Sequence, residues 1–230
     1  MRLPRGFVAA WMAILASGCD SPPELTTASG AGCDPTGQSL QVVGGGSSPE
    51  LVSLSSAQRA AVAALVVGTD PAGLCSAVVV EPGRALTAAH CTPAGVELAL
   101  AFGDNVWSPA AMSAVHTVQQ HERLDAALVE FTPSPCVPVE SISIIEAQVD
   151  TGQAAEIAGF GFTSPTGSSS GDLQFAATTV VDIEPDYFVV EDALDHSAAC
   201  LGDSGGPLLV ATANGVRVAG VLDNGDSGCD

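Results

Sequence analysis

The sequence predicts an all-β protein, and three observations lead to this fold class. Its apolar runs are short and rich in β-branched residues, which favours strands over helices. Prolines and glycines separate these runs, for example at Pro82, Gly83 and Pro133. The 230 residues are 47% hydrophobic but only 4% aromatic, so aliphatic side chains must fill a core large enough for one large β domain or two small ones. The clearest strand candidates are residues 64–67, 77–80, 127–131 and 187–190.

Three stretches depart from this pattern. Residues 55–67 are rich in alanine and could begin as a helix, because a short apolar run does not separate helix from strand. Residues 162–171 carry a run of Ser and Gly and are expected to form a loop. Residues 20–41 combine Ser, Pro, Thr and Gly without a hydrophobic period, which is typical of a flexible tether or pro-segment.

Residues 1–19 have the organisation of an export signal peptide. Arg2 and Arg5 give a positive start, and residues 7–16 are apolar but too few to span a bilayer. The segment ends in Leu-Ala-Ser-Gly-Cys, which resembles the site at which bacterial lipoproteins are cut and lipidated, with the leucine one place early. We expect an exported protein that is either anchored to the cell envelope by a lipid on Cys19 or extracellular. An ordinary signal peptide with a stray cysteine is the alternative.

Charge and composition narrow the classes of partner. The formal net charge is −20, and all six basic residues are arginine. Nucleic acid is not expected as a partner, because binding it requires cations that neutralise phosphates. No His, Cys and Asp cluster has the spacing of metal ligands, and no glycine-rich phosphate loop occurs, so neither a metal nor a cofactor is expected. Any contact with a membrane would come through the lipid anchor.

Two motifs in the middle of the chain offer a base and a carboxylate. Residues 87–91 read Thr-Ala-Ala-His-Cys, in which His90 is a candidate general base. Asp125 lies within the otherwise apolar run 124–128. A carboxylate in such surroundings suits the orientation of an imidazole ring.

A third motif offers the nucleophile. Residues 200–207 read Cys-Leu-Gly-Asp-Ser-Gly-Gly-Pro, so Ser204 is flanked by glycines that allow a tight turn with an exposed hydroxyl. The main-chain N–H groups of Gly202 and Ser204 can point at one spot and stabilise a developing oxyanion. Base, acid and nucleophile follow one another in the order His, Asp, Ser.

These motifs in this order resemble those of the trypsin-like (chymotrypsin-family) serine proteases, in a bacterial exported form. Subtilisins and α/β-hydrolases use other chain orders, which disfavours an esterase of another fold. The resemblance covers residues 42–230 as a peptidase domain. It implies two packed six-stranded β-barrels, about residues 42–140 and 141–230, with the catalytic site in the cleft between them. Gly159-Phe160-Gly161 resembles the Gly-Trp-Gly of the family.

The activity that the resemblance implies is hydrolysis of peptide bonds in a protein or peptide substrate through an acyl-enzyme. His90 would accept the proton of Ser204 and pass it to the leaving amine, while Asp125 would fix the tautomer of the ring. The alternative is a catalytically weak or inactive protease-like module that binds a partner on the cell envelope.

The chain holds seven cysteines, which leaves one unpaired in an exported protein. The resemblance pairs the other six as Cys75 with Cys91, Cys200 with Cys229, and Cys33 with Cys136. Cys19 is then the odd cysteine, as lipidation requires. Other pairings with a free thiol elsewhere stay open.

Residues 42–45, Val-Val-Gly-Gly, resemble the mature N-terminus of the family. There, cleavage frees an α-amine that inserts beside the aspartate before the nucleophile, so Val42 would meet Asp203. Gln41 precedes the cut, and an activating protease would therefore not be one that cleaves after Arg or Lys. The other interpretation is that Val42 merely begins a strand.

The expected substrate pocket departs from the pattern of the family. Its base would be Ala198, six residues before the nucleophile. Without a carboxylate there, a basic substrate side chain would bury its charge unpaired, so small or medium apolar side chains are expected.

The far wall of this pocket, residues 220–225, is also unusual. Asp223 replaces a serine, Asn224 replaces a tryptophan, and Gly225 follows as in the family. Two carboxylates, Asp125 and Asp223, would repel each other, so one would tend to stay protonated and activity would be weak or shifted in pH. The chain ends one residue after Cys229, and the second barrel is therefore expected to be truncated at its C-terminus.

Overall fold

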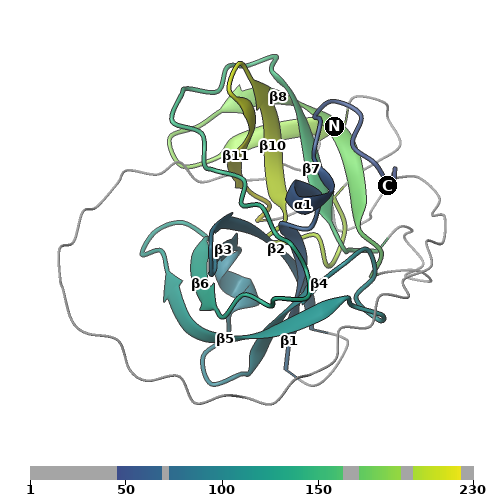
Figure 1. Ribbon diagram of the computed structural model, residues 1–230. Helices are drawn as coiled ribbons and strands as arrows, with labels where there is room; N and C mark the ends of the chain where they lie inside the picture. Colours follow the sequence, from purple (N-terminus) through teal and green to yellow (C-terminus); the bar gives the residue numbers. More distant parts are fainter. Residues whose placement is uncertain (1–45, 69–72, 163–170, 193–198, 224–230) are drawn as a thin grey trace, which may run out of the picture.

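The structure is a computed structural model that describes residues 46–68, 73–162, 171–192 and 199–223 (Figure 1). Within these ranges eleven strands accompany one helical turn, α1 (Ser56–Arg59), and one 3-10 turn, η1 (Ala89–Cys91). The predicted all-β fold class is confirmed. In the described part of the chain, no helix has the length and apolar character needed to cross a membrane.

Six strands form a closed antiparallel barrel, which occupies the lower half of Figure 1. They are β1 (Val62–Val67), β2 (Leu74–Glu81), β3 (Arg84–Thr87), β4 (Leu98–Phe102), β5 (Ala111–Gln120) and β6 (Ala127–Phe131). Their order around the barrel is β1-β2-β3-β6-β5-β4, and β1 closes it by pairing with β4. The core is largely aliphatic, with Leu65, Val78 and Leu100 fully buried, as the low aromatic content requires.

Five strands form a second antiparallel sheet, in the upper half of Figure 1. They are β7 (Ala154–Gly159), β8 (Gln174–Ile183), β9 (Phe188–Asp192), β10 (Pro207–Thr212) and β11 (Gly215–Val221), in the order β11-β10-β7-β8-β9. The closed barrel and this second sheet confirm the chymotrypsin-like architecture. A sixth strand of the second barrel is not among the described residues, and the expected truncation falls on residues 224–230, which lie outside them.

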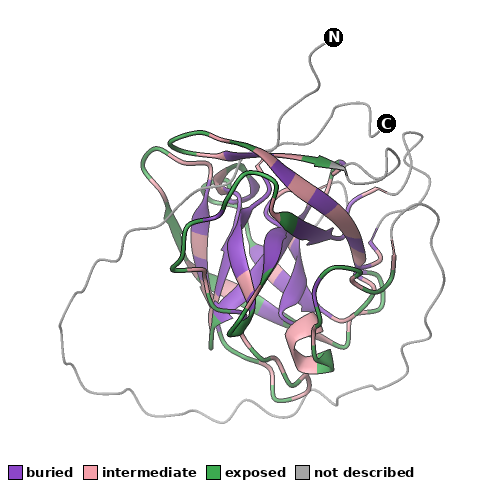
Figure 2. Cartoon of the chain, turned by 90° about the horizontal axis from the view of Figure 1, so that it is seen from above, coloured by how far each residue is buried: buried purple, intermediate pink, exposed green. Residues whose placement is uncertain are grey.

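One apolar core joins the barrel to the second sheet. Phe160 after β7, Phe175 of β8 and Val218 of β11 belong to the same cluster of buried side chains as Leu65 and Phe102 of the barrel. Figure 2 shows buried residues, in purple, along the strands, whereas most exposed residues, in green, lie in the connecting segments. The loops between the barrel and the second sheet therefore rest on one continuous packed core.

The ambiguous segment 55–67 contains both a helix and a strand. Ser55 Oγ accepts a hydrogen bond from Gln58 N at 3.1 Å, and Gln58 Oε1 accepts one from Ser55 N at 3.1 Å. This capping box starts the single helical turn α1. Strand β1 then begins at Val62 and runs into the barrel core.

A buried carboxylate fixes the segment before α1 to the second sheet. Glu156 of β7 is fully buried and accepts hydrogen bonds from the N–H groups of Glu50, Leu51 and Val52 at 2.7, 2.8 and 3.2 Å. These three donors replace the water that the carboxylate loses on burial. The chain therefore passes from the second sheet to the barrel at a fixed point.

Candidate active site

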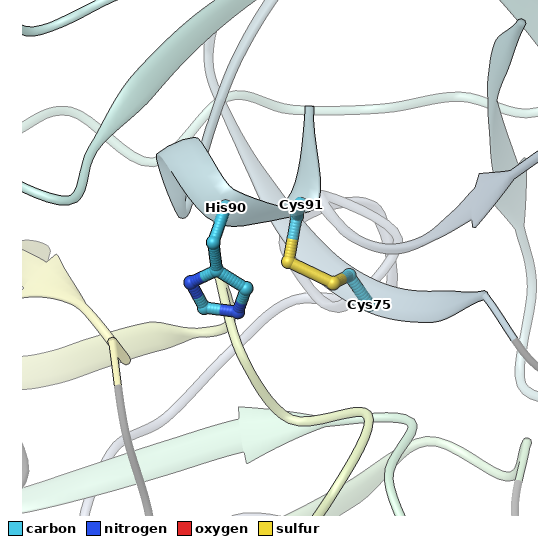
Figure 3. Close-up of side chains that lie close together, drawn as sticks. All are labelled: Cys75, His90 and Cys91. Atoms are coloured by element: carbon cyan, nitrogen blue, oxygen red, sulfur yellow. A yellow bond between two sulfur atoms is a disulfide. The ribbon is translucent and has the colours of Figure 1, made fainter. Parts of the chain in front are cut away.

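His90 lies just after β3, on turn η1. The turn is tied to β2 by the Cys75–Cys91 disulfide, one of the three pairs that the resemblance implies (Figure 3). Cys91 is buried, whereas the side chain of His90 is 48% exposed. The disulfide thus fixes the backbone of the turn and leaves the imidazole open to solvent.

Asp125 holds His90 by two hydrogen bonds. Asp125 Oδ1 accepts from the main-chain N–H of His90 at 2.8 Å, and Oδ2 lies 2.5 Å from Nδ1 of the ring. Nδ1 therefore carries the hydrogen, and Nε2 is left as the acceptor, which is the tautomer that a general base needs. The fold brings these two predicted site residues together across 35 positions of sequence.

Gln120, at the end of β5, supports the turn that carries His90. Its side-chain amide donates to the main-chain oxygens of Ala89 and Thr92, both at 3.0 Å, and lies 2.9 Å from Thr92 Oγ1. These acceptors stand on either side of His90 in the chain. No motif marks Gln120 in the sequence, and only its position shortly before the Asp125 run could have drawn attention to it.

His121, the next residue, supports the segment that carries Asp125. Its Nδ1 accepts hydrogen bonds from the N–H groups of Arg123 and Leu124 at 3.2 and 3.1 Å. Its own N–H donates to Ala126 O at 2.8 Å. Gln120, the last residue of β5, and His121 after it therefore support the predicted base and the predicted carboxylate.

Ser204, the predicted nucleophile, lies in a loop of residues 200–206 that leads into β10 and is called the nucleophile loop below. Its main-chain oxygen accepts a hydrogen bond from Ser76 N at 2.8 Å and lies 3.7 Å from Cys91 Sγ. The Ser204 hydroxyl donates to the main-chain oxygen of Asp223 at 3.4 Å. Because Cys91 directly follows His90, the loop from the second sheet reaches the turn that carries the base.

Gly205 makes this approach possible. Its φ is +83°, and a Cβ at this position would lie 2.1 Å from Thr87 Oγ1 and 2.3 Å from Ser76 O. Any side chain would therefore push the nucleophile loop away from the barrel. The glycine that follows Ser204 in the motif is required by close packing.

The two predicted oxyanion donors are unoccupied in the described part of the chain. Neither the N–H of Gly202 nor that of Ser204 donates a hydrogen bond to another described residue. The peptide before Gly202 is fixed, since Leu201 O accepts from Phe162 N at 2.9 Å. Both donors are therefore available to an oxygen that carries negative charge.

Asp203 is held by main-chain donors. Its Oδ1 accepts from Gly161 N and its Oδ2 from Cys200 N, both at 2.9 Å. A Cβ on Gly159 or on Gly161 would collide with this carboxyl group, so both glycines leave room for it. Burial raises the pKa of Asp203 to about 6, although the two hydrogen bonds act in the opposite direction. Val42, its expected partner, lies outside the described residues.

Asp223 places a second carboxyl beside Asp125. Its Oδ1 lies 3.9 Å from Nδ1 of His90. Burial and a hydrogen bond with Asp125 raise the pKa of Asp223 to about 7. Burial acts to raise the pKa of Asp125 as well, but hydrogen bonds from Asp223 and His90 outweigh it and lower that pKa below its usual value. Below pH 7 the pair therefore consists of a protonated Asp223 and an ionised Asp125.

The same three side chains have the spacing of a metal site. His90 Nδ1 and one oxygen each of Asp125 and Asp223 lie within 4.8 Å of one another. An ion there would have to replace the hydrogen bond between His90 and Asp125. Cys75 and Cys91, also near His90, form a disulfide and offer no thiolate. Hydrogen bonding accounts for the cluster, and we assign no metal to it.

The remaining site predictions fall on residues that the structure does not describe. These residues are Cys19, Cys33, Val42, Ala198, Asn224, Gly225 and Cys229. Cys136 and Cys200 are each disulfide-bonded, and the partners expected for them are among these seven. The two further pairings, the base of the pocket and the lipid anchor stay predictions.

Comparison of the sequence with known proteins identifies the family to which the chain belongs. A sequence model described as the trypsin-like peptidase domain matches residues 75–220, a range that contains His90, Asp125 and Ser204. A protein of Corynebacterium glutamicum that carries the name of a peptidase is 31% identical over 153 residues, which are 64% of this chain and 52% of that protein.

Two fly proteins are similar to the same degree. Trypsin eta of Drosophila melanogaster is 32% identical over 132 residues, which are 50% of this chain and 48% of that protein. Trypsin eta of Drosophila erecta is 30% identical over 184 residues, which are 67% of this chain and 69% of that protein. The match spans about half the length of the bacterial relative and of the Drosophila melanogaster relative.

The support that Gln120 gives to the His90 turn can be tested by substitution. The change Gln120→Ala removes the amide that holds the His90 turn, and misplacing a base by a fraction of an ångström is costly. We expect reaction of Ser204 with a fluorophosphonate probe to slow by about tenfold, and the downfield NMR signal of the His90–Asp125 proton to broaden. Gln119→Ala, on the exposed neighbour, is the control. Equal labelling rates for the two variants would contradict the assigned role.

Proposed function

Because the chain belongs to the trypsin-like peptidase family, we propose that it is a serine endopeptidase with Ser204 as nucleophile, His90 as general base and Asp125 as orienting carboxylate. One observation carries the proposal. Asp125 binds both the main chain and the ring of His90, on a turn that the main chain of Ser204 also contacts. The family implies proteins or peptides as substrates.

The proposed reaction is acyl transfer in two steps. A serine hydroxyl is a poor nucleophile until a base takes its proton. Nε2 of His90 accepts that proton as Ser204 Oγ attacks the scissile carbonyl, and then gives it to the leaving amine. Water, activated by the same nitrogen, releases the acyl group and restores Ser204. Asp125 stabilises the imidazolium that forms between these transfers.

The free N–H groups of Gly202 and Ser204 suit the charge that develops in the transition state. The carbonyl oxygen of the substrate becomes an oxyanion as Ser204 attacks it. Among the described residues neither donor has another acceptor, so both are available to that oxyanion. Loss of one such donor typically costs about 2.7–4 kcal/mol of transition-state stabilisation.

We further propose a preference for small or apolar substrate side chains over basic ones. Ala198 would leave the base of the pocket uncharged, and Asn224 and Gly225 would line its wall. Asp223 also belongs to that wall, but its carboxyl is hydrogen-bonded to Asp125. It is therefore not free to pair with a basic side chain of the substrate.

The proposed location is outside the cytoplasm. The signal-like residues 1–19 support export, and Cys19 would carry a lipid that anchors the protein to the cell envelope. Without lipidation the protein would be extracellular.

A second candidate function is a protease-like binding module with weak or no catalysis. The specific observation in its favour is Asp223, which brings a second carboxyl to within 3.9 Å of the His90 ring. Once ionised, this carboxyl places a second negative charge beside the ring and repels Asp125, which disfavours the single orienting carboxylate that the endopeptidase needs.

An active-site probe separates the two functions. A fluorophosphonate should label the wild-type protein at Ser204, because only an activated serine reacts with it, and should leave Ser204→Ala unlabelled. Ser108→Ala, at an exposed serine, serves as the control and should label as the wild type does. A folded wild-type protein that takes up no label would contradict the endopeptidase and favour the binding module.

Paired ester or peptide substrates test the specificity. Substrates with Ala or Val before the scissile bond should be cleaved at least tenfold faster, as kcat/KM, than those with Arg, because an unpaired buried charge is costly. Introducing a carboxylate by Ala198→Asp should reduce or reverse this ratio. Faster cleavage after Arg by the wild type would show the specificity assignment to be wrong.

The effect of Asp223 is testable through the pH profile. Since its pKa is about 7, Asp223 adds negative charge beside His90 as the pH rises through neutrality. The variant Asp223→Ser removes this charge, so kcat/KM should rise near and above pH 7 and change little well below pH 7, where Asp223 is already protonated. The rise should reach at most about fivefold, the effect of roughly 1 kcal/mol for unit charges 4 Å apart in a high dielectric.

The remote exposed carboxylate Asp150 provides the control, as Asp150→Ser. A pH profile of Asp223→Ser that is unchanged near and above pH 7, or lower activity of that variant at pH 7, would count against a charge effect of Asp223.

A further inference from the structure

Ser76 of β2 links the barrel to the nucleophile loop through its main chain and its side chain. It is fully buried. Its N–H donates to Ser204 O at 2.8 Å, and its carbonyl accepts from Thr87 Oγ1 at 2.7 Å. Its hydroxyl donates to Gly202 O at 2.9 Å and accepts from Phe160 N at 3.0 Å. One residue of the barrel therefore binds both ends of the segment 202–204.

The hydroxyl of Ser76 anchors the peptide that follows the oxyanion donor Gly202. A hydroxyl has one hydrogen, and here that hydrogen goes to Gly202 O. Gly202 has a φ of +101°, and the absence of a Cβ gives its peptides freedom that other residues lack. With Leu201 O held by Phe162 N and Gly202 O held by Ser76, both peptides around Gly202 are anchored.

The carboxylate of Asp203, next to Gly202, pairs with no cationic group among the described residues. Asp203 accepts two main-chain hydrogen bonds, from Gly161 and Cys200. It takes part in none of the ion pairs found within the described ranges. In these ranges the N–H groups of Gly202 and Ser204 donate to no described residue, and the hydrogen bonds to the Asp203 carboxyl come from neutral main-chain donors.

We propose that Ser76 is a positioning residue that holds the Gly202–Ser204 segment in its oxyanion-binding form, so that the chain is competent without a freed α-amine at Val42. The proposal rests on the proposed endopeptidase function, because it concerns the same site. The Ser76 hydroxyl restrains the loop from the barrel side. A buried ammonium beside Asp203 would restrain the same loop from the other side. Cleavage before Val42 then becomes dispensable for the reactivity of Ser204.

The test compares one protein before and after cleavage. The full chain is prepared with a specific protease site introduced directly before Val42, and mass spectrometry establishes whether the bond to Val42 is intact or cut. The rate of labelling by a fluorophosphonate is measured for both forms, because the phosphonyl oxygen occupies the oxyanion site. The same pair of forms is prepared for Ser76→Ala.

The uncut wild type should label within about threefold of the cut form. Uncut Ser76→Ala should label at least thirtyfold more slowly than uncut wild type. Cutting before Val42 should restore much of the lost rate in this variant, since the new amine can then order the loop through Asp203. A purely structural role of Ser76 would predict no such rescue.

Thr178→Val provides a matched control. Thr178 of β8 is also a buried residue, and its hydroxyl donates to one main-chain oxygen, that of Glu191, at 2.6 Å. Its loss should lower the melting temperature without changing the labelling rate of the uncut form.

Three outcomes would overturn the proposal. If the uncut wild type is unreactive while the cut form labels, activation requires the amine, and the endopeptidase assignment still stands. If both folded forms are unreactive, the proposed function fails and this proposal fails with it. If uncut Ser76→Ala labels as fast as uncut wild type, Ser76 does not position the loop. The first and third outcomes do not depend on how stable a single variant is.

Discussion

The docking of the nucleophile loop on the wall of the barrel is the contact on which the rest of the site depends. Ser204 belongs to the second half of the fold, and His90 and Asp125 belong to the first. The loop that holds Ser204 reaches the turn that holds His90 because Ser76 N donates to Ser204 O and because Gly205 lets the loop lie directly against Thr87. The Cys75–Cys91 disulfide sits at the same place and fixes the strand and turn on which this contact rests.

The site also shows how a very acidic chain can bury carboxyl groups. Asp203 and Glu156 are held by main-chain N–H groups, and Asp125 is held by the main chain and ring of His90. The main-chain donors among these are fixed by the fold and lose no side-chain entropy, so they hold a carboxylate in one orientation. Asp223 differs, since its carboxyl faces another carboxyl and shares a proton with it.

The sequence predicted the parts of the molecule that are encoded locally. Short motifs marked His90, Asp125 and Ser204, and turn residues between β-branched runs marked the all-β fold. The segment 55–67 stayed ambiguous because a single capped turn and a strand occupy the same alanine-rich stretch. Its outcome was decided by the capping box of Ser55 and Gln58 and by burial of β1 in the barrel.

The supporting residues could not be predicted, because their partners are distant in the chain. Ser76 bonds to Gly202 across 126 positions and to Phe160 across 84. Gln120 bonds to Ala89 across 31. Each bond depends on strand register and on how the two halves pack, which no local pattern records. The pocket residues Ala198, Asn224 and Gly225 stay predictions, as do Val42 and Cys19.

The shared core of the barrel and the second sheet limits how this fold can recombine during evolution. Phe160 and Phe175 fill space in the same cluster as Leu65 and Phe102. If one half were replaced by that of a related protein, its side chains would therefore pack poorly against the other half in the shared core. Recombination at the midpoint should succeed only between parents whose interior residues have co-adapted, whereas exchange of exposed loops escapes this restriction.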